Sequence, residues 1–225
     1  MNLWIPLTVL GSLLLLAKEI PQKRIRKVLD NNQREKIKKY GTNNFGLTFN
    51  NWTIVGIRGG LPNDKGIIST NSNENDEWND TIVLIKGDVS KAFQATLDPG
   101  KKWIDTPLNA KGTFRISEGL YFYSPGLHDG RKAFRAASKV KGIRDSFKDG
   151  KWDSNDIIVE EKYAGEFGVN IHAMYRAGKV NGNSAGCTVL KHGWTSPDWI
   201  EFRDTLYNSF QNRIPYLVVN ASRIV

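Results

Sequence analysis

The sequence contains few of the side chains that usually bind metals or form disulfides. It has one cysteine and three histidines in 225 residues. A single thiol, Cys187, excludes a disulfide scaffold and any multi-cysteine zinc or iron–sulfur site. Three histidines (His128, His172 and His192) argue against a histidine-rich metal site. We therefore expect neither a metal nor a cofactor.

Composition excludes several further classes of protein. Hydrophobic residues make up 40% and charged residues 24% of the chain, which excludes wholesale disorder, a collagen-like repeat and a polytopic membrane protein. The length suffices for one domain of about 150–200 residues with an appended segment.

Positive charge is concentrated in residues 18–40. Nine Lys or Arg and three acidic residues there give +6 of the net +9, so residues 41–225 carry only +3. Such a segment can bind anionic lipid headgroups or packaged nucleic acid. No base-reading motif accompanies it, so sequence-specific recognition of nucleic acid is not expected.

An uncharged apolar run, LWIPLTVLGSLLLLA, precedes this basic segment at residues 3–17. As a helix it spans roughly 22 Å, and inclusion of Met1 with snorkelling of Lys18 brings it closer to the ~30 Å hydrocarbon core. A cleaved signal peptide would need a positive start and a small-residue cleavage site. A soluble helix is the third alternative. We predict a retained membrane anchor at 1–17 and a basic juxtamembrane helix or linker at 18–40.

The rest of the chain, residues 41–225, is predicted to be one mainly β domain. The sequence Gly41-Thr42-Asn43-Asn44 is expected to break the helical pattern and mark its start. Ser196 is a suitable N-cap for a helix with an apolar stripe, and a second short helix is expected at 131–139. A hairpin is expected at 113–123. Other β-rich runs lie at 52–58, 81–86, 93–97, 168–173, 187–190 and 214–220. This pattern predicts a sandwich or a partly open barrel with one or two helices.

The segment 168–190 (GVNIHAMYRAGKVNGNSAGCTVL) carries the candidate chemistry. A cysteine nucleophile needs a base within hydrogen-bond reach, and His172 lies fifteen residues before Cys187. Two adjacent antiparallel strands joined by a loop would bring the two side chains together. Amides near Gly186 and Cys187 would then point at a developing oxyanion. A lone cysteine is more often a buried small hydrophobe, and this reading stays open.

Ile171-His172 followed by Ser184-Ala185-Gly186-Cys187 resembles the signature of the L,D-transpeptidase catalytic domain. That signature is a histidine, a loop of about fifteen residues, and then Ser/Thr-His-Gly-Cys. The resemblance implies a β-sandwich that acts on the peptide stem of peptidoglycan through a thioester. It further implies that Cys187 is the nucleophile, that His172 is the base, and that the carbonyl of Ala173 orients this histidine.

The sequence departs from the family signature at two places. Ala185 replaces the second histidine, and Thr188-Val189 replaces an apolar residue followed by Arg or Asn. Both departures put strict transpeptidation in doubt. A cation is also needed for the substrate carboxylate, for which Arg144 and Arg176 are candidates. His128 is a candidate to line the cleft in place of the missing histidine.

Together these features predict a membrane-anchored cysteine enzyme that cleaves or remodels peptidoglycan stem peptides, as a lytic peptidase or an L,D-transpeptidase. The basic segment places the domain on the cytoplasmic side of a bacterial inner membrane, whereas peptidoglycan lies outside it. A phage virion enzyme beneath an internal membrane would resolve this conflict. The alternatives are a non-catalytic structural protein that links a membrane to capsid or nucleic acid, and an unrelated cysteine hydrolase.

Overall fold

The computed structural model describes residues 27–161 and 168–225. The expected membrane anchor at 1–17 lies outside these residues, as do residues 18–26 of the basic segment. Across the described ranges, none of the helices has the length and apolar character needed to traverse a bilayer.

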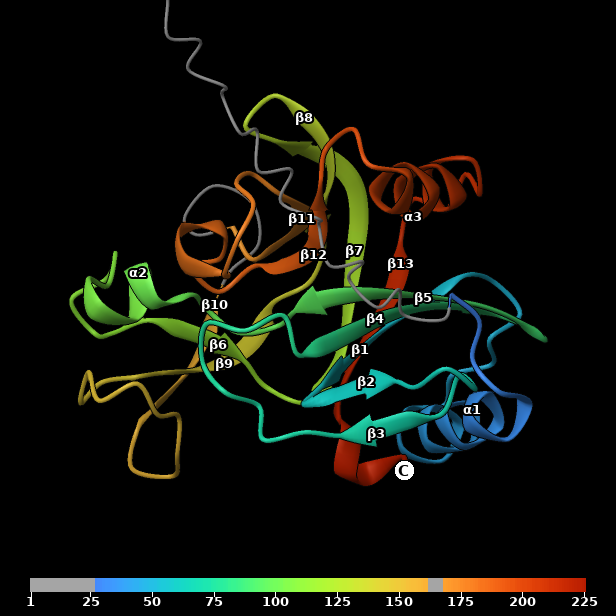
Figure 1. Ribbon diagram of the computed structural model, residues 1–225, viewed down its shortest axis with the longest axis horizontal. Coiled ribbons are helices and arrows are strands. Elements are labelled where there is room, and N and C mark those ends of the chain that lie inside the picture. Colours follow the sequence, from blue (N-terminus) through green and yellow to red (C-terminus); the bar gives the residue numbers. More distant parts are fainter. Residues whose placement is uncertain (1–26, 162–167) are drawn as a thin grey trace, which may run out of the picture.

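Eight strands form a closed barrel that organises the molecule (Figure 1). In spatial order they are β1 (Thr53–Arg58), β13 (Ile214–Asn220), β7 (Gly119–His128), β8 (Arg131–Ala136), β11 (Asn170–Met174), β12 (Thr188–Gly193), β5 (Val89–Thr96) and β4 (Asp80–Lys86). The mainly β class is confirmed, but the expected sandwich or partly open barrel is corrected to a closed barrel. Closure occurs because β1 pairs with β4 on one side and, in parallel, with β13 on the other. An alternation of inward and outward residues is common to sandwiches and barrels, so it does not reveal this pairing.

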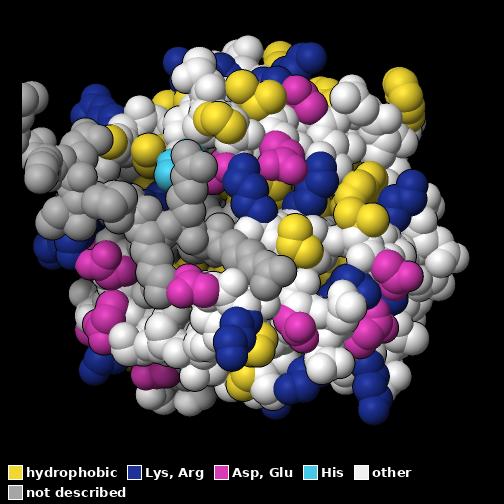
Figure 2. All heavy atoms as spheres, turned by 45° about the vertical axis from the view of Figure 1, so that its right-hand side comes forward, with side chains coloured by type: hydrophobic (Ala, Val, Ile, Leu, Met, Phe, Trp, Pro, Cys, Tyr) yellow, Lys and Arg dark blue, Asp and Glu magenta, His cyan; other side chains and the backbone are white. Residues whose placement is uncertain are grey.

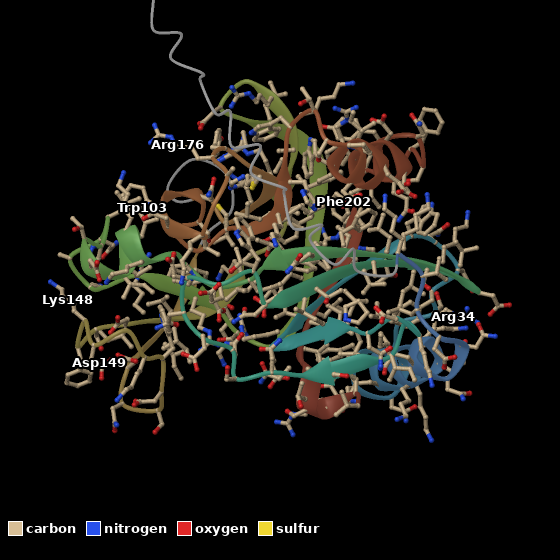
Figure 3. The ribbon with its side chains drawn as sticks, viewed as in Figure 1. Arg34, Trp103, Lys148, Asp149, Arg176 and Phe202 are labelled. Atoms are coloured by element: carbon tan, nitrogen blue, oxygen red, sulfur yellow. The ribbon has the colours of Figure 1, made fainter. Side chains whose placement is uncertain are left out.

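Helix α3 (Pro197–Tyr207) packs against the barrel interior (Figures 1 and 3). It begins as predicted, because the Ser196 hydroxyl accepts a hydrogen bond from the backbone N–H of Trp199 at 3.2 Å. Trp199, Phe202 and Leu206 are fully buried and belong to the same hydrophobic cluster as the inward residues of the strands.

Helix α1 (Asn31–Phe45) covers an outer face of the barrel beside the short strands β2 (Gly60–Pro62) and β3 (Ile68–Thr70) (Figure 1). The break expected at Gly41 is absent, and the helix ends instead at Gly46, whose φ is 68°. A Cβ at Gly41 would lie 2.8 Å from the ring of Phe49, so this glycine permits close packing rather than a turn. Residues 31–45 therefore pack onto the body.

A three-stranded sheet of β6 (Phe114–Ile116), β9 (Val140–Arg144) and β10 (Ile157–Glu161) accompanies the barrel. The hairpin predicted at 113–123 is wrong, because β6 pairs with β9 while β7 pairs with β8 and β13. The helix predicted at 131–139 is also wrong, since β8 occupies that segment. Asp129 and Gly130 both have positive φ, and this Asp-Gly turn joins β7 to β8 as a hairpin. The remaining elements are the short helices α2 (Lys101–Asp105), η1 (Asn181–Asn183) and η2 (Ala221–Arg223).

The surface of the body carries charges of both signs. On the face shown in Figure 2, Lys and Arg side chains alternate with Asp and Glu. This view agrees with the small net charge of residues 41–225 and with the concentration of positive charge further toward the N-terminus.

Candidate functional site

The candidate site is built on β11 and β12, which are neighbours in the barrel. They pair in parallel, with Ile171 opposite Thr188 and His172 opposite Val189. The expectation of antiparallel strands is therefore wrong. The chain leaves the end of β11, crosses over through residues 175–187 and enters β12 from the same end at which β11 began, as parallel pairing requires.

This register places the cysteine and the histidine on one face. Ile171, Ala173 and Leu190 belong to the main core inside the barrel. Because side chains alternate along a strand, His172 and Cys187 both project from the outer face, and His172 lies opposite Val189, two residues beyond Cys187. The parallel register thus places on one face the two residues that the sequence singled out.

Cys187 is buried beneath the crossover. Its side chain is 9% exposed and packs with Trp78 and Val180. The Sγ atom accepts a hydrogen bond from the Asn170 N–H and donates one to the Gly168 carbonyl, both at 3.4 Å. Burial raises the pKa of the thiol to about 11, against the opposing effect of the Asn170 N–H. The resting group is therefore a thiol at neutral pH.

His172 is 1% exposed and has a defined tautomer. Its Nδ1 lies 2.8 Å from the carbonyl oxygen of Ala173, the contact that the family resemblance implied. A carbonyl oxygen only accepts, so Nδ1 carries the proton and Nε2 keeps its lone pair. Burial, followed by the neighbouring His128, lowers the pKa of His172 to about 3. The ring is thus a neutral imidazole whose lone pair is on Nε2.

Aromatic rings enclose the His172 imidazole. His128 stacks on it with centroids 4.3 Å apart, and Trp194 lies nearly parallel to it at 6.0 Å. Tyr175, at 5.5 Å, is tilted against it and donates its hydroxyl hydrogen to Asp129. These contacts limit the orientations open to the catalytic candidate.

Ser184 and Gly186 shape the turn that enters β12. The Ser184 hydroxyl donates to the Cys187 carbonyl at 2.8 Å and accepts from the Gly186 N–H at 3.2 Å. Gly186 has a φ of 122°, and a Cβ there would lie 2.7 Å from the carbonyl oxygen of Phe114. The Gly186 amide is used within the turn, which corrects the expectation that it points at an oxyanion. Both residues instead hold Cys187 in position.

The two candidate arginines occupy different environments. Arg144, on β9, is 2% exposed and donates to the Gly112 carbonyl at 2.8 Å, so it supports the main chain beside Ala185. Arg176 is exposed at the rim of a cavity of about 780 Å³, on the same side of the molecule as Trp103 (Figure 3). Tyr175 lines this cavity as well and connects it to the rings around His172.

Sequence reasoning assigned no role to three residues that complete the site. Asn170 contacts the sulfur of Cys187, and Tyr175 and Trp194 surround His172. Arg131 lies over both of these rings, at 5.4 and 5.3 Å from their centroids. No spacing in the sequence relates these positions, because β8, β11 and β12 meet only through the barrel. The one local signal was Asn170, two residues before the histidine on the same strand face.

No group of three His, Cys, Asp or Glu side chains arranged to hold a metal occurs in residues 27–161 and 168–225. No protein-family model matches the chain, and the searches of curated proteins and of solved structures also found no match.

Proposed function

We propose that this protein is a cysteine acyl-transfer enzyme that acts on amide bonds of peptidoglycan stem peptides, as a peptidase or an L,D-transpeptidase. One observation carries the proposal: Cys187 and His172 share the outer face of two paired strands, and the Ala173 carbonyl holds the histidine in the tautomer of a general base. The peptidoglycan substrate comes from the family resemblance alone.

The reaction follows from these protonation states. Nε2 of His172 takes the proton from Sγ of Cys187, and the thiolate attacks the carbonyl carbon of the amide. The C–N bond then breaks, and the imidazolium of His172 gives its proton to the leaving amine. The resulting thioester is released by water in a peptidase or by an acceptor amine in a transpeptidase. His172 removes a proton from that acceptor, and the thiol of Cys187 is restored.

Burial makes the nucleophile dependent on its base. Both groups rest in the neutral form, because burial raises the pKa of Cys187 and lowers that of His172. Separate ionisation of either group is disfavoured, whereas a proton passed between them forms an ion pair whose charges attract strongly in a medium of low dielectric constant. We infer that the thiolate forms only together with the imidazolium.

The cavity beside Tyr175 offers a place for the anionic part of the substrate. Lys101, Lys102, Arg176 and Lys179 line it together with Asp76 and Asp129. Lys101 pairs with Asp105 and Lys179 with Glu77, whereas Arg176 and Lys102 have no carboxylate within 4.0 Å among the described residues. Stem peptides carry carboxylates, which Arg and Lys bind well. Of the two candidate arginines, Arg176 is the one accessible to a substrate.

The proposed location is a membrane surface, with attachment through residues 1–40. The apolar run and the basic segment support it, together with anionic lipid or packaged nucleic acid as partners of that segment. We retain both settings, a bacterial inner membrane and the internal membrane of a virion. Copurification of the protein with host envelopes or with phage particles distinguishes them.

The decisive experiment compares full-length protein with Cys187→Ala and His172→Ala on purified peptidoglycan. The muropeptides are identified by mass spectrometry. His192→Ala is the matched control, since this partly exposed ring lies near Asp198. We expect new products from the parent and from the His192 variant only, with masses that separate hydrolysis from cross-linking. Equal products from the Cys187 variant would refute the proposal.

Burial of the thiol also favours a second candidate, a non-catalytic structural protein that links a membrane to capsid or nucleic acid. In that protein Cys187 is a small buried hydrophobe, and Ala185 reflects the loss of a family histidine. A folded parent that releases no product from walls of several chemical types would establish this alternative over the enzyme.

A further inference from the structure

We propose that His128 is a positioning residue that fixes the ring of His172, and that Asn170 holds His128 in place. The inference rests on the proposed function for its catalytic meaning. It replaces the expectation that His128 binds substrate. The geometry that carries it is a stack of rings joined to the nucleophile through one asparagine.

The stack constrains His172 in three directions. His128 covers one side of its imidazole at 4.3 Å with an interplanar angle of 23°, and Trp194 lies parallel to the ring at 6.0 Å with an angle of 7°. The Ala173 carbonyl fixes the rotation of the ring in its own plane. Preorganisation of this kind matters because a misplacement of about 1 Å at a reacting group costs on the order of a hundredfold in rate.

Asn170 connects this stack to Cys187. Its backbone N–H donates to Sγ, while its side-chain Nδ2 lies 2.9 Å from Nδ1 of His128. An amide nitrogen only donates, so Nδ1 of His128 accepts and this ring holds its proton on Nε2. Asn170 is 6% exposed, which leaves its carboxamide few other partners. One residue therefore contacts both the nucleophile and the ring that supports the base.

The neutral form of His128 is part of this role. A positive charge stacked on His172 would oppose the proton that His172 must accept. Burial lowers the pKa of His128. The charge of Arg135 lowers it further, and the charge of Asp129 opposes this by raising it. Tyr175 is tilted against both rings, Arg131 lies over the Tyr175 ring, and Asp129 favours the protonated form of His172. A buried neutral ring in the stack leaves the basicity of His172 available for the thiol.

The test uses two substitutions at His128 that distinguish the effect of its ring packing from the effect of its titratable group. His128→Phe keeps an aromatic ring without a titratable group, whereas His128→Ala removes both and opens the site to water. The protonation and tautomer of His172 are followed by nitrogen-15 NMR as a function of pH in the full-length protein. The partly exposed His192 serves as an internal reference, and thermal unfolding shows whether each variant is folded.

We expect His172 to remain a neutral Nδ1–H tautomer down to about pH 4 in the parent. In His128→Ala the pKa of His172 rises by at least about one unit and both tautomers are populated. His128→Phe and Asn170→Ala both give intermediate results, because each keeps a ring beside His172 but loses the hydrogen bond from Asn170 Nδ2 to residue 128. If His128→Phe behaves like His128→Ala, or if His128→Ala leaves His172 unchanged, the proposal is wrong.

Peptidoglycan digestion provides the catalytic readout. We expect kcat within about threefold of the parent for His128→Phe, and a loss of about tenfold to a hundredfold for His128→Ala with a similar KM. A substrate-binding role would instead raise KM in both variants. If the parent itself releases no product, the proposed function fails, while the NMR result still decides whether His128 positions His172.

Discussion

The clearest quantitative consequence of the structure is a slow, strongly pH-dependent reaction of Cys187 with an alkylating reagent. A thiol of pKa about 11 is ionised to roughly one part in a thousand at about pH 8. A free thiol with pKa ~8.5 is about one quarter ionised there, so Cys187 has about two hundredfold less thiolate. Because nucleophilicity rises with pKa, each Cys187 thiolate is about tenfold more reactive. The net expectation is a rate roughly twentyfold below that of glutathione, before any reduction by limited access.

The assay is the mass of the intact protein after timed exposure to iodoacetamide. The sole thiol of the chain gives a single adduct, and Cys187→Ala provides the blank. The rate should rise about tenfold per pH unit from about pH 7 to 10. A rate that levels off below about pH 8 would contradict this reasoning, because it would show a thiolate already stabilised in the resting protein. Slow alkylation together with peptidoglycan cleavage would mean that the nucleophile forms only when substrate is bound.

Three further predictions concern the framework of the site. Gly186→Ala places a Cβ 2.7 Å from a main-chain oxygen. Gly178 is the control, because it has a similarly positive φ and a Cβ there would meet no atom within 4 Å. Denaturant titration should show Gly186→Ala to be less stable than Gly178→Ala by about 1–3 kcal/mol. Ile37→Ala leaves a cavity at a fully buried position of α1 and should lower the unfolding free energy by about 2–5 kcal/mol in the same titration. Lys36→Ala, at an exposed position of the same helix, should leave it nearly unchanged. Equal stabilities of the two variants would show that α1 does not pack on the barrel. Asp80→Asn should lower the unfolding free energy by about 1–3 kcal/mol, because the two carboxylate oxygens accept separate backbone N–H groups and an amide offers only one acceptor; an unchanged unfolding midpoint would contradict this.

Local signals in the sequence predicted much of the secondary structure. Strands at 52–58, 81–86 and 214–220 are confirmed as β1, β4 and β13, and the Ser196 cap marks the start of α3. These features succeed because side-chain alternation and capping act over only a few residues. The wrong predictions at 131–139 and at Gly41 also concern signals that involve only a few neighbouring residues. The Asp-Gly turn at 129–130 leads into a strand rather than a helix at 131–139, and Gly41 permits close packing within α1 rather than ending it.

The sequence by itself singled out Cys187 and His172, through their residue types and their spacing, and the carbonyl of Ala173 followed from the resemblance. Only the tertiary structure decided that β11 and β12 run parallel, which sets the two side chains on one outward face. It alone brought His128, Tyr175 and Trp194 around the histidine and buried Arg144 while leaving Arg176 exposed. The physical reason is that register and barrel closure depend on pairings between strands far apart in the chain. Such pairings leave no periodic trace in the sequence, although they determine which side chains meet.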